Sequence, residues 1–172
     1  TVSKPVRERS LHGALVDAVS GAAVVKTTAA DVGRHTTHLD LGQARILLVE
    51  DVEVNRLVAL AMLDRLGAAV DVAVNGVQAV DMIAATRYDL VLMDCQMPEM
   101  DGFEATRAVR SAEAGDYRTP IIALTANALQ GDKERCTAAG MDGYLSKPVQ
   151  LDALATMLER WLPSKPPANH AA

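Results

Sequence analysis

The sequence predicts an α/β fold in which a doubly wound, five-stranded parallel sheet carries helices on both faces. Short apolar runs alternate five times with helical stretches between residues 45 and 162. The first of these runs is rich in β-branched and aliphatic residues and stops abruptly at two acidic residues, which is typical of a strand buried on both faces. Strands that alternate with helices favour a parallel sheet with right-handed crossovers.

The first predicted strand and helix cover residues 45–49 and 54–66. The strand reads Arg-Ile-Leu-Leu-Val and ends before Glu50 and Asp51. In the helical stretch, apolar residues recur near helical spacing, and Gly67 supplies a helix-ending residue. Those apolar residues are Val54, Leu57, Val58, Ala61, Met62 and Leu66.

The next segment contains two strands with a helix between them. Residues 68–74 form the second expected strand, and an Asn-Gly turn at Asn75 leads into a helix over 77–85. The third strand, 90–93, is a Leu-Val-Leu-Met run that ends at Asp94. This segment therefore continues the alternation of strand and helix.

The remaining elements complete the alternation. A helical pattern is followed by an Ile-Ile-Ala-Leu strand, a second helical pattern, a short strand and a last amphipathic helix. Their expected ranges are 103–111, 121–124, 130–139, 143–146 and 151–162.

Composition sets limits on function. The chain has 172 residues, 49% of them hydrophobic, a net charge of −5 and 3% aromatic residues. It has no block of Lys and Arg that would attract nucleic acid, and no run near the roughly 20 apolar residues of a membrane span. We therefore expect a cytoplasmic segment that contacts neither nucleic acid nor membrane, although its parent protein can still be membrane-anchored. The two cysteines, Cys95 and Cys136, are expected to be reduced and buried.

The sequence predicts one complete domain at residues 44–162. Residues 21–43, rich in Ala, Thr and Gly, are expected to form a linker, and residues 163–172 a disordered tail. Residues 1–20 repeat the end of the domain: Ser-Lys-Pro-Val occurs at Ser3 and again at Ser146, with helical leucines following in the same register. We interpret 1–20 as the remnant of the carboxyl-terminal end of an upstream domain of the same fold, with a stray amphipathic helix as the alternative.

Chemistry-bearing residues stand at the carboxyl ends of the predicted strands. Glu50 and Asp51 follow the first strand, Asp94 the third, Thr125 the fourth and Lys147 the fifth. In a doubly wound sheet these ends meet at one edge, where ligands bind. Three carboxylates repel one another unless a cation lies between them, and oxygen ligands select Mg²⁺, with Mn²⁺ as the other choice.

Such a site can take up a phosphoryl group. A carboxylate can attack phosphorus to form an aspartyl phosphate, while a metal ion, an ammonium group and a hydroxyl group neutralise the phosphoryl oxygens. Each residue alone has a simpler structural interpretation. The acidic pair suits a solvated turn, and Asp94 and Thr125 suit helix caps. Their joint occurrence at successive strand ends favours the site.

These motifs resemble the receiver domains of two-component response regulators over residues 45–162. The resemblance rests on four segments of the sequence: Ile-Leu-Leu-Val-Glu-Asp from Ile46, Leu-Met-Asp-Cys-Gln-Met-Pro-Glu-Met-Asp-Gly from Leu92, Ala-Leu-Thr-Ala from Ala123 and Tyr-Leu-Ser-Lys-Pro from Tyr144. It implies a flavodoxin-like (βα)5 fold. The forms that these motifs take in this sequence are most similar to those of the carboxyl-terminal receivers of hybrid histidine kinases, including kinases with tandem receivers.

The resemblance implies a role for each matching residue. Asp94 is the phosphoacceptor. Glu50, Asp51, Asp94 and the backbone carbonyl of Gln96 hold Mg²⁺. Thr125 is the switch hydroxyl, Lys147 contacts the phosphoryl group, and Tyr144 is the aromatic residue that moves on activation.

The implied function is Mg²⁺-dependent phosphoryl transfer to Asp94 from a phosphohistidine on a histidine kinase or histidine phosphotransfer domain, which switches a signalling conformation. The domain would catalyse its own phosphorylation and dephosphorylation, within a parent histidine kinase whose catalytic part is absent here. Two alternatives stay open. One is a phosphorylation-independent interaction module of the same fold that regulates a kinase. The other is a phosphatase with an Asp nucleophile, disfavoured because Gln96 stands where such enzymes often place a second carboxylate.

Overall fold

The computed structural model describes residues 41, 44–113, 117–126 and 130–162. The predicted upstream remnant (1–20) and tail (163–172) lie outside the described residues, as does nearly all of the predicted linker (21–43), so these predictions stay predictions. Leu41, near the end of the predicted linker, packs against the core, and its carbonyl accepts the Ala44 N–H at 3.1 Å.

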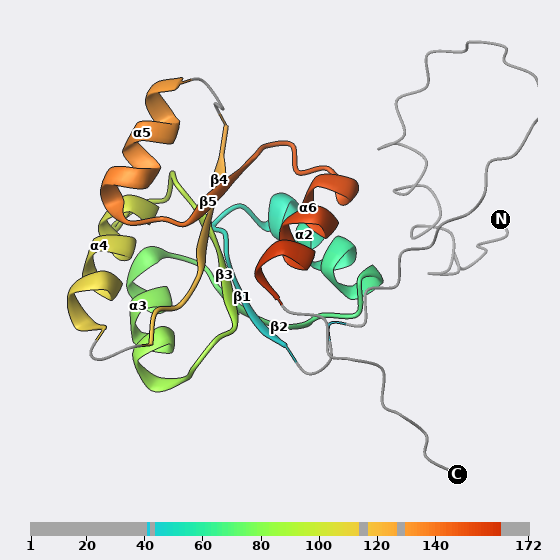
Figure 1. The fold of residues 1–172 in the computed structure, drawn as a ribbon, viewed down its shortest axis with the longest axis horizontal. Helices are drawn as coiled ribbons and strands as arrows, with labels where there is room; N and C mark the ends of the chain where they lie inside the picture. The colour runs from blue at the N-terminus through green and yellow to red at the C-terminus, as the bar shows by residue number, and fades with distance from the viewer. Residues whose placement is uncertain (1–40, 42–43, 114–116, 127–129, 163–172) are drawn as a thin grey trace, which may run out of the picture. The chain divides into compact units, whose positions relative to one another are not determined.

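The predicted five-stranded parallel sheet is confirmed (Figure 1). Its strands lie in the order β2-β1-β3-β4-β5, and every neighbouring pair is parallel. This order is that of the flavodoxin-like doubly wound fold. The strands are β1 (Arg45–Val49), β2 (Ala69–Ala73), β3 (Leu90–Asp94), β4 (Ile121–Thr125) and β5 (Gly143–Ser146).

Helices cover both faces of the sheet, as the alternating pattern predicted. Figure 1 shows α3, α4 and α5 on one face, and α2 and α6 on the other. The bounds agree with the predicted ranges to within one or two residues at each end. They are α2 (Glu53–Arg65), α3 (Gly76–Ala85), α4 (Gly102–Ala112), α5 (Gln130–Ala139) and α6 (Leu151–Trp161).

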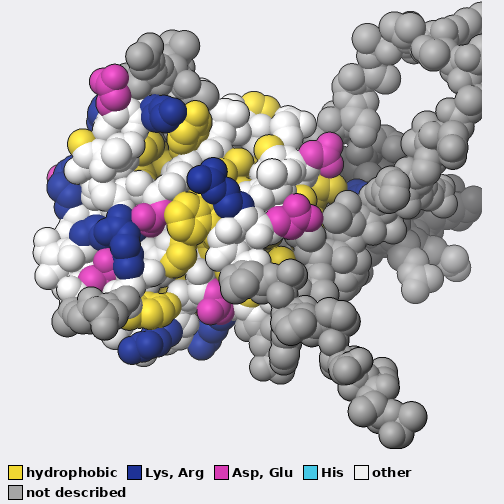
Figure 2. Space-filling model, in the orientation of Figure 1, with side chains coloured by type: hydrophobic (Ala, Val, Ile, Leu, Met, Phe, Trp, Pro, Cys, Tyr) yellow, Lys and Arg dark blue, Asp and Glu magenta, His cyan; other side chains and the backbone are white. Residues whose placement is uncertain are grey.

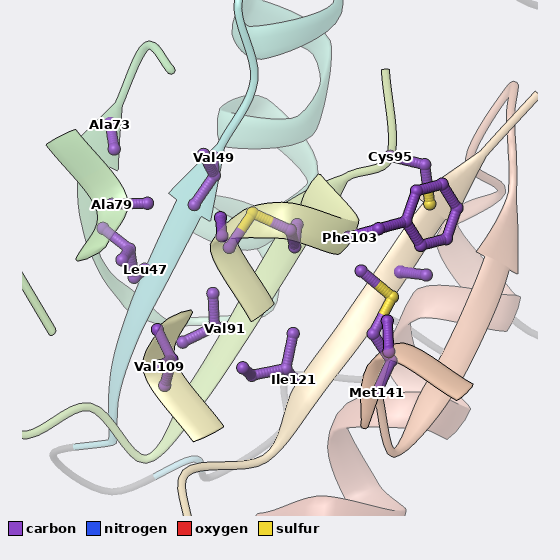
Figure 3. Packing of buried hydrophobic residues seen from close by; sticks show 14 of the residues in the cluster. Leu47, Val49, Ala73, Ala79, Val91, Cys95, Phe103, Val109, Ile121 and Met141 are labelled. Atoms are coloured by element: carbon purple, nitrogen blue, oxygen red, sulfur yellow. The ribbon is translucent and has the colours of Figure 1, made fainter. Parts of the chain in front are cut away.

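Two buried clusters hold the helices to the sheet. Alternate residues of each strand point to opposite faces, so Leu47 and Val49 belong to one cluster while Ile46 and Leu48 belong to the other. Figure 3 shows the first cluster, where side chains of the sheet project toward Val109 of α4. Both cysteines lie in this cluster, and each is 3% exposed, so their predicted burial is confirmed.

Helix α2 is present as predicted, but its buried face differs from the apolar spacing that predicted it. Val54 and Leu57 are 68% and 59% exposed, whereas Ala59 and Leu63 are buried. Apolar residues lie on more than one side of this helix, and spacing alone does not say which side meets the sheet. The outward-facing residues near its amino end therefore form an exposed apolar surface.

Charged side chains are mixed over the part of the surface that the structure describes in Figure 2. On that face, Lys and Arg side chains lie next to Asp and Glu side chains instead of forming a block of one sign. The described part of this face therefore presents no large patch of a single sign of charge.

Candidate functional site

The predicted site residues meet at the point where strand order reverses. The chain runs from β1 to β2 on one side and continues at β3 on the other, and ligands bind at such a crevice beyond the carboxyl ends of the strands. Glu50 and Asp51 leave β1 there, and Asp94 is the last residue of the adjacent β3. Sheet topology thus brings together three carboxylates that are far apart in the sequence.

Lys147 joins two of these carboxylates. Its Nζ lies 2.6 Å from Oε2 of Glu50 and 2.7 Å from Oδ2 of Asp94. The Lys147 side chain is 20% exposed, while those of Glu50 and Asp94 are only 2% and 6% exposed. The lysine backbone is itself fixed, because its N–H donates to the carbonyl of Thr125 at 2.7 Å. The predicted ammonium group therefore reaches the predicted phosphoacceptor.

Burial and charge act in opposite directions on this pair. Burial raises the pKa of Asp94 above the ordinary aspartate value of 3.8, and the hydrogen bonds from Lys147 and the Gln96 N–H offset this only in part. For Lys147, burial alone would lower the pKa, but the hydrogen bonds to Asp94 and Glu50 outweigh it and leave the pKa above 10.5. The lysine is therefore a permanent positive charge in the pocket at neutral pH.

The acidic residues suit a hard divalent cation. Glu50, Asp51 and Asp94 each present a carboxylate oxygen, and these oxygens lie within 4.8 Å of one another. Oδ1 of Asp51 is buried and has no hydrogen-bond partner among the described residues. A buried carboxylate oxygen without a donor is costly, and a cation would satisfy it. An oxygen-only ligand set fits Mg²⁺.

The loop after Asp94 holds that residue in place. The N–H of Gln96 donates to Oδ1 of Asp94 at 3.2 Å, and the N–H of Cys95 donates to the Leu124 carbonyl at 3.1 Å. Asp101 then begins α4 with a capping box that includes Glu104. The Gln96 backbone is therefore next to the acidic pocket, and its carbonyl stays the predicted fourth metal ligand.

The two predicted switch residues lie on the neighbouring strands. Thr125 is the last residue of β4 and is 4% exposed, in register with Ser146 of β5. Tyr144 lies on β5, is partly buried against the core, and has the Lys133 Nζ 5.9 Å from its ring centroid. Their positions agree with the prediction, and their switching roles stay predictions.

Sequence reasoning missed two residues of α2 that contact the acidic pair. Nδ2 of Asn55 donates to Oε1 of Glu50 at 2.9 Å. Nη1 of Arg56 donates to the carbonyls of Glu50 and Asp51 at 3.2 and 3.3 Å. In the sequence, the only indication was that Asn55 and Arg56 lie about one helical turn after the acidic pair. That position does not reveal the direction of their side chains.

Comparisons with known proteins agree with this geometry. The family model for the response regulator receiver domain matches residues 46–159. The hybrid signal transduction protein dokA of Dictyostelium discoideum is 44% identical over 117 residues, which are 68% of this chain and 7% of that protein. The chain spans between 7% and 16% of the lengths of the first curated relatives that it matches.

Two solved structures are informative neighbours. One is the receiver domain of the sensor histidine kinase PA1611 from Pseudomonas aeruginosa PAO1, with a magnesium ion coordinated in its active-site cleft. It is 51% identical, with a TM-score of 0.65, and the match covers 70% of this chain and 98% of that one. The other is the Saccharomyces cerevisiae complex of the histidine phosphotransfer protein Ypd1 with the receiver domain of Ssk1. It is 30% identical, with a TM-score of 0.65 and coverages of 70% and 89%.

The fold and the acidic pocket define a receiver module of two-component signalling. The chain belongs to the response regulator receiver domain family, and its relatives include hybrid histidine kinases. Among the helices that the structure describes, none is both long and apolar enough to cross a membrane.

Proposed function

We propose that this receiver domain accepts a phosphoryl group on Asp94, with Mg²⁺ bound, from a phosphohistidine on a histidine kinase or a histidine phosphotransfer domain. The observation that carries the proposal is the pocket in which Asp94 lies 2.7 Å from the Lys147 ammonium and shares its edge of the sheet with Glu50 and Asp51. A buried carboxylate with a permanent cation and a metal-binding acidic pair beside it is suited to phosphoryl transfer.

The chain's own residues would position the reacting groups. A carboxylate oxygen of Asp94 forms the new P–O bond while the P–N bond of phosphohistidine breaks, and the leaving imidazole takes the electron pair and then a proton. Lys147 would neutralise one phosphoryl oxygen as a point charge, and the Thr125 hydroxyl group at the end of β4 would bind another. Glu50, Asp51, Asp94 and the Gln96 carbonyl would hold Mg²⁺, which supplies positive charge against the phosphoryl oxygens.

Phosphorylation would then bias a two-state equilibrium. Moving a population from about 1:99 to 99:1 takes about 5.5 kcal/mol of differential stabilisation. New bonds from Thr125 and Lys147 to the phosphoryl group can supply this free energy. Lys147 already contacts both Glu50 and Asp94, so it can turn toward a phosphoryl group on Asp94. Tyr144, partly buried on β5 three residues before Lys147, is the aromatic residue expected to follow this change.

Transfer from a phosphohistidine tests the proposal directly. A histidine phosphotransfer domain labelled with ³²P on its histidine is mixed with the chain, and the label on each protein is followed with Mg²⁺ or with EDTA. We expect label to move to the chain only with Mg²⁺ and to be absent from the Asp94→Asn variant. Transfer that persists in Asp94→Asn would contradict the assignment of the acceptor.

The exposed apolar surface of α2 supports the choice of a protein donor. Val54, Leu57 and Val58 are 68%, 59% and 36% exposed on the helix that begins directly after the acidic pair. Large apolar residues that remain exposed together mark a surface that another protein covers. Their place next to the pocket suits a donor domain that presents its phosphohistidine to Asp94.

Replacing Leu57 with glutamine is expected to slow transfer from the phosphohistidine domain by about tenfold, which corresponds to about 1.4 kcal/mol of lost contact. Glutamine is uncharged and forms helices about as readily as leucine does, so α2 should form as in the wild type and leave the pocket unchanged. Phosphorylation by acetyl phosphate, a small donor that needs no docking surface on the exposed side of α2, is the internal control and should proceed at the wild-type rate. Equal slowing of transfer from the phosphohistidine domain and from acetyl phosphate would show that Leu57 acts on the pocket and not on docking.

A further inference from the structure

Glu50 is held differently from the other two acids of the pocket. It is 1% exposed, and each of its carboxylate oxygens has a donor: Asn55 Nδ2 on Oε1 at 2.9 Å and Lys147 Nζ on Oε2 at 2.6 Å. Glutamate has one more rotatable bond than aspartate, so an unrestrained side chain has more rotamers to choose from. The two donors on opposite oxygens select one of them.

Asp51 has the opposite environment. Its Oδ1 is buried and has no partner among the described residues, although Asp51 is the next residue along the chain from Glu50. The two acids therefore differ: each Glu50 oxygen accepts one hydrogen bond and keeps a lone pair for a cation, whereas Oδ1 of Asp51 has no donor among the described residues. This difference depends on Asn55, because without its amide Oε1 of Glu50 would also need a new partner inside the pocket.

We propose that Asn55 is a positioning residue for the metal site, which fixes the Glu50 carboxylate against Lys147 and so keeps the three carboxylates in the arrangement that binds Mg²⁺. This inference rests on the proposed function, and it adds a residue that touches neither the metal ion nor the phosphoryl group. An amide suits the task because it donates a hydrogen bond without adding a positive charge that would repel the cation. The neighbouring Arg56 reaches only backbone carbonyls of the acidic pair.

The expected effect is on metal affinity. Groups that orient metal ligands typically change the affinity by 10- to 100-fold when removed. Because only one of Glu50's two donors is lost, we expect Asn55→Ala to raise the dissociation constant for Mg²⁺ about tenfold. Alanine is a better helix former than asparagine, so α2 should still form. Asn55→Gln retains an amide donor and should recover part of the affinity.

Calorimetric titration of Mg²⁺ into the full chain tests the inference, with melting temperatures measured in EDTA. The variants are Asn55→Ala, Asn55→Gln and, as a control, Arg65→Ala at an exposed site in the last turn of the same helix. We expect weaker binding in Asn55→Ala, partial recovery in Asn55→Gln and wild-type binding in Arg65→Ala, while melting in EDTA measures separately what the lost hydrogen bond costs the metal-free fold. The acetyl phosphate rate of Asn55→Ala should return to the wild-type value at saturating Mg²⁺.

Three outcomes would overturn the inference. If wild type and Asn55→Ala bind Mg²⁺ equally, Asn55 does not position the site, and the proposed function is unaffected. A slow acetyl phosphate rate that persists at saturating Mg²⁺ would show that Asn55 acts on the structure of the pocket and not through metal binding. If the wild-type chain binds no Mg²⁺ at all, the proposed function fails first, and the inference fails with it.

Discussion

Replacing Asp51 with asparagine is expected to raise the dissociation constant for Mg²⁺ at least about 100-fold, a loss of about 2.7 kcal/mol. The reason is that Oδ1 of Asp51 is the buried carboxylate oxygen in the pocket that no described residue satisfies. Asparagine has nearly the same shape, so the turn after β1 should be retained. Removing one of three neighbouring negative charges also relieves repulsion, so the metal-free variant should be at least as stable as the wild type.

Thermal unfolding with and without Mg²⁺ measures this effect. A ligand that binds only the folded state stabilises it by about 2.7 kcal/mol at 100 times its dissociation constant. The wild type should therefore melt at a clearly higher temperature in Mg²⁺, whereas Asp51→Asn should gain at most about 0.4 kcal/mol at the same concentration. Asp64→Asn removes the same charge from an exposed position on α2 and should respond like the wild type. Stabilisation of Asp51→Asn equal to that of the wild type would show that the ion does not bind at this residue.

Replacing Gly102 with alanine is expected to destabilise the fold by about 3 kcal/mol, the upper end of ordinary overpacking. A Cβ at this position would lie 2.1 Å from the backbone oxygen of Asp94 and 3.0 Å from its carbonyl carbon. Backbone atoms of a central strand cannot move aside as the end of a flexible side chain can. The same displacement would shift Asp94 itself, so acetyl phosphate labelling should fall together with stability.

Gly143→Ala is the matched comparison for this prediction. A Cβ there would first meet Cδ1 of Ile122 at 3.0 Å, and that methyl group can rotate away. Urea unfolding of both variants should show a clearly larger loss of unfolding free energy for Gly102→Ala. Similar small losses in both would mean that the loop after Asp94 adjusts readily, which would weaken the view of Asp94 as rigidly placed.

Fold class and the main pocket residues were predictable from sequence because their signals are local. The three central strands are short apolar runs; Asp94 and Thr125 end two of them, and Lys147 directly follows β5. Once parallel pairing is inferred, the carboxyl ends of the strands must lie at one edge. No side-chain conformation was needed to place these residues together.

Other features depend on rotations that the sequence does not encode locally. The exposed position of Leu57 follows from how α2 is turned against the sheet, and apolar spacing allowed more than one answer. The contact of Asn55 with Glu50, and the sharing of Lys147 between Glu50 and Asp94, are choices of rotamer inside an assembled pocket. The predicted upstream remnant at residues 1–20 remains a prediction for a different reason, because these residues lie outside the part of the chain that the structure describes.

Intact-mass spectrometry after incubation with acetyl phosphate shows directly whether Asp94 accepts a phosphoryl group with Mg²⁺ bound. The full chain is compared with Asp94→Asn, each with Mg²⁺ and with EDTA. We expect the gain of one phosphoryl group by the wild type with Mg²⁺, no gain in EDTA and no gain by Asp94→Asn. A gain by Asp94→Asn equal to that of the wild type, or a gain by the wild type that is independent of Mg²⁺, would contradict this expectation.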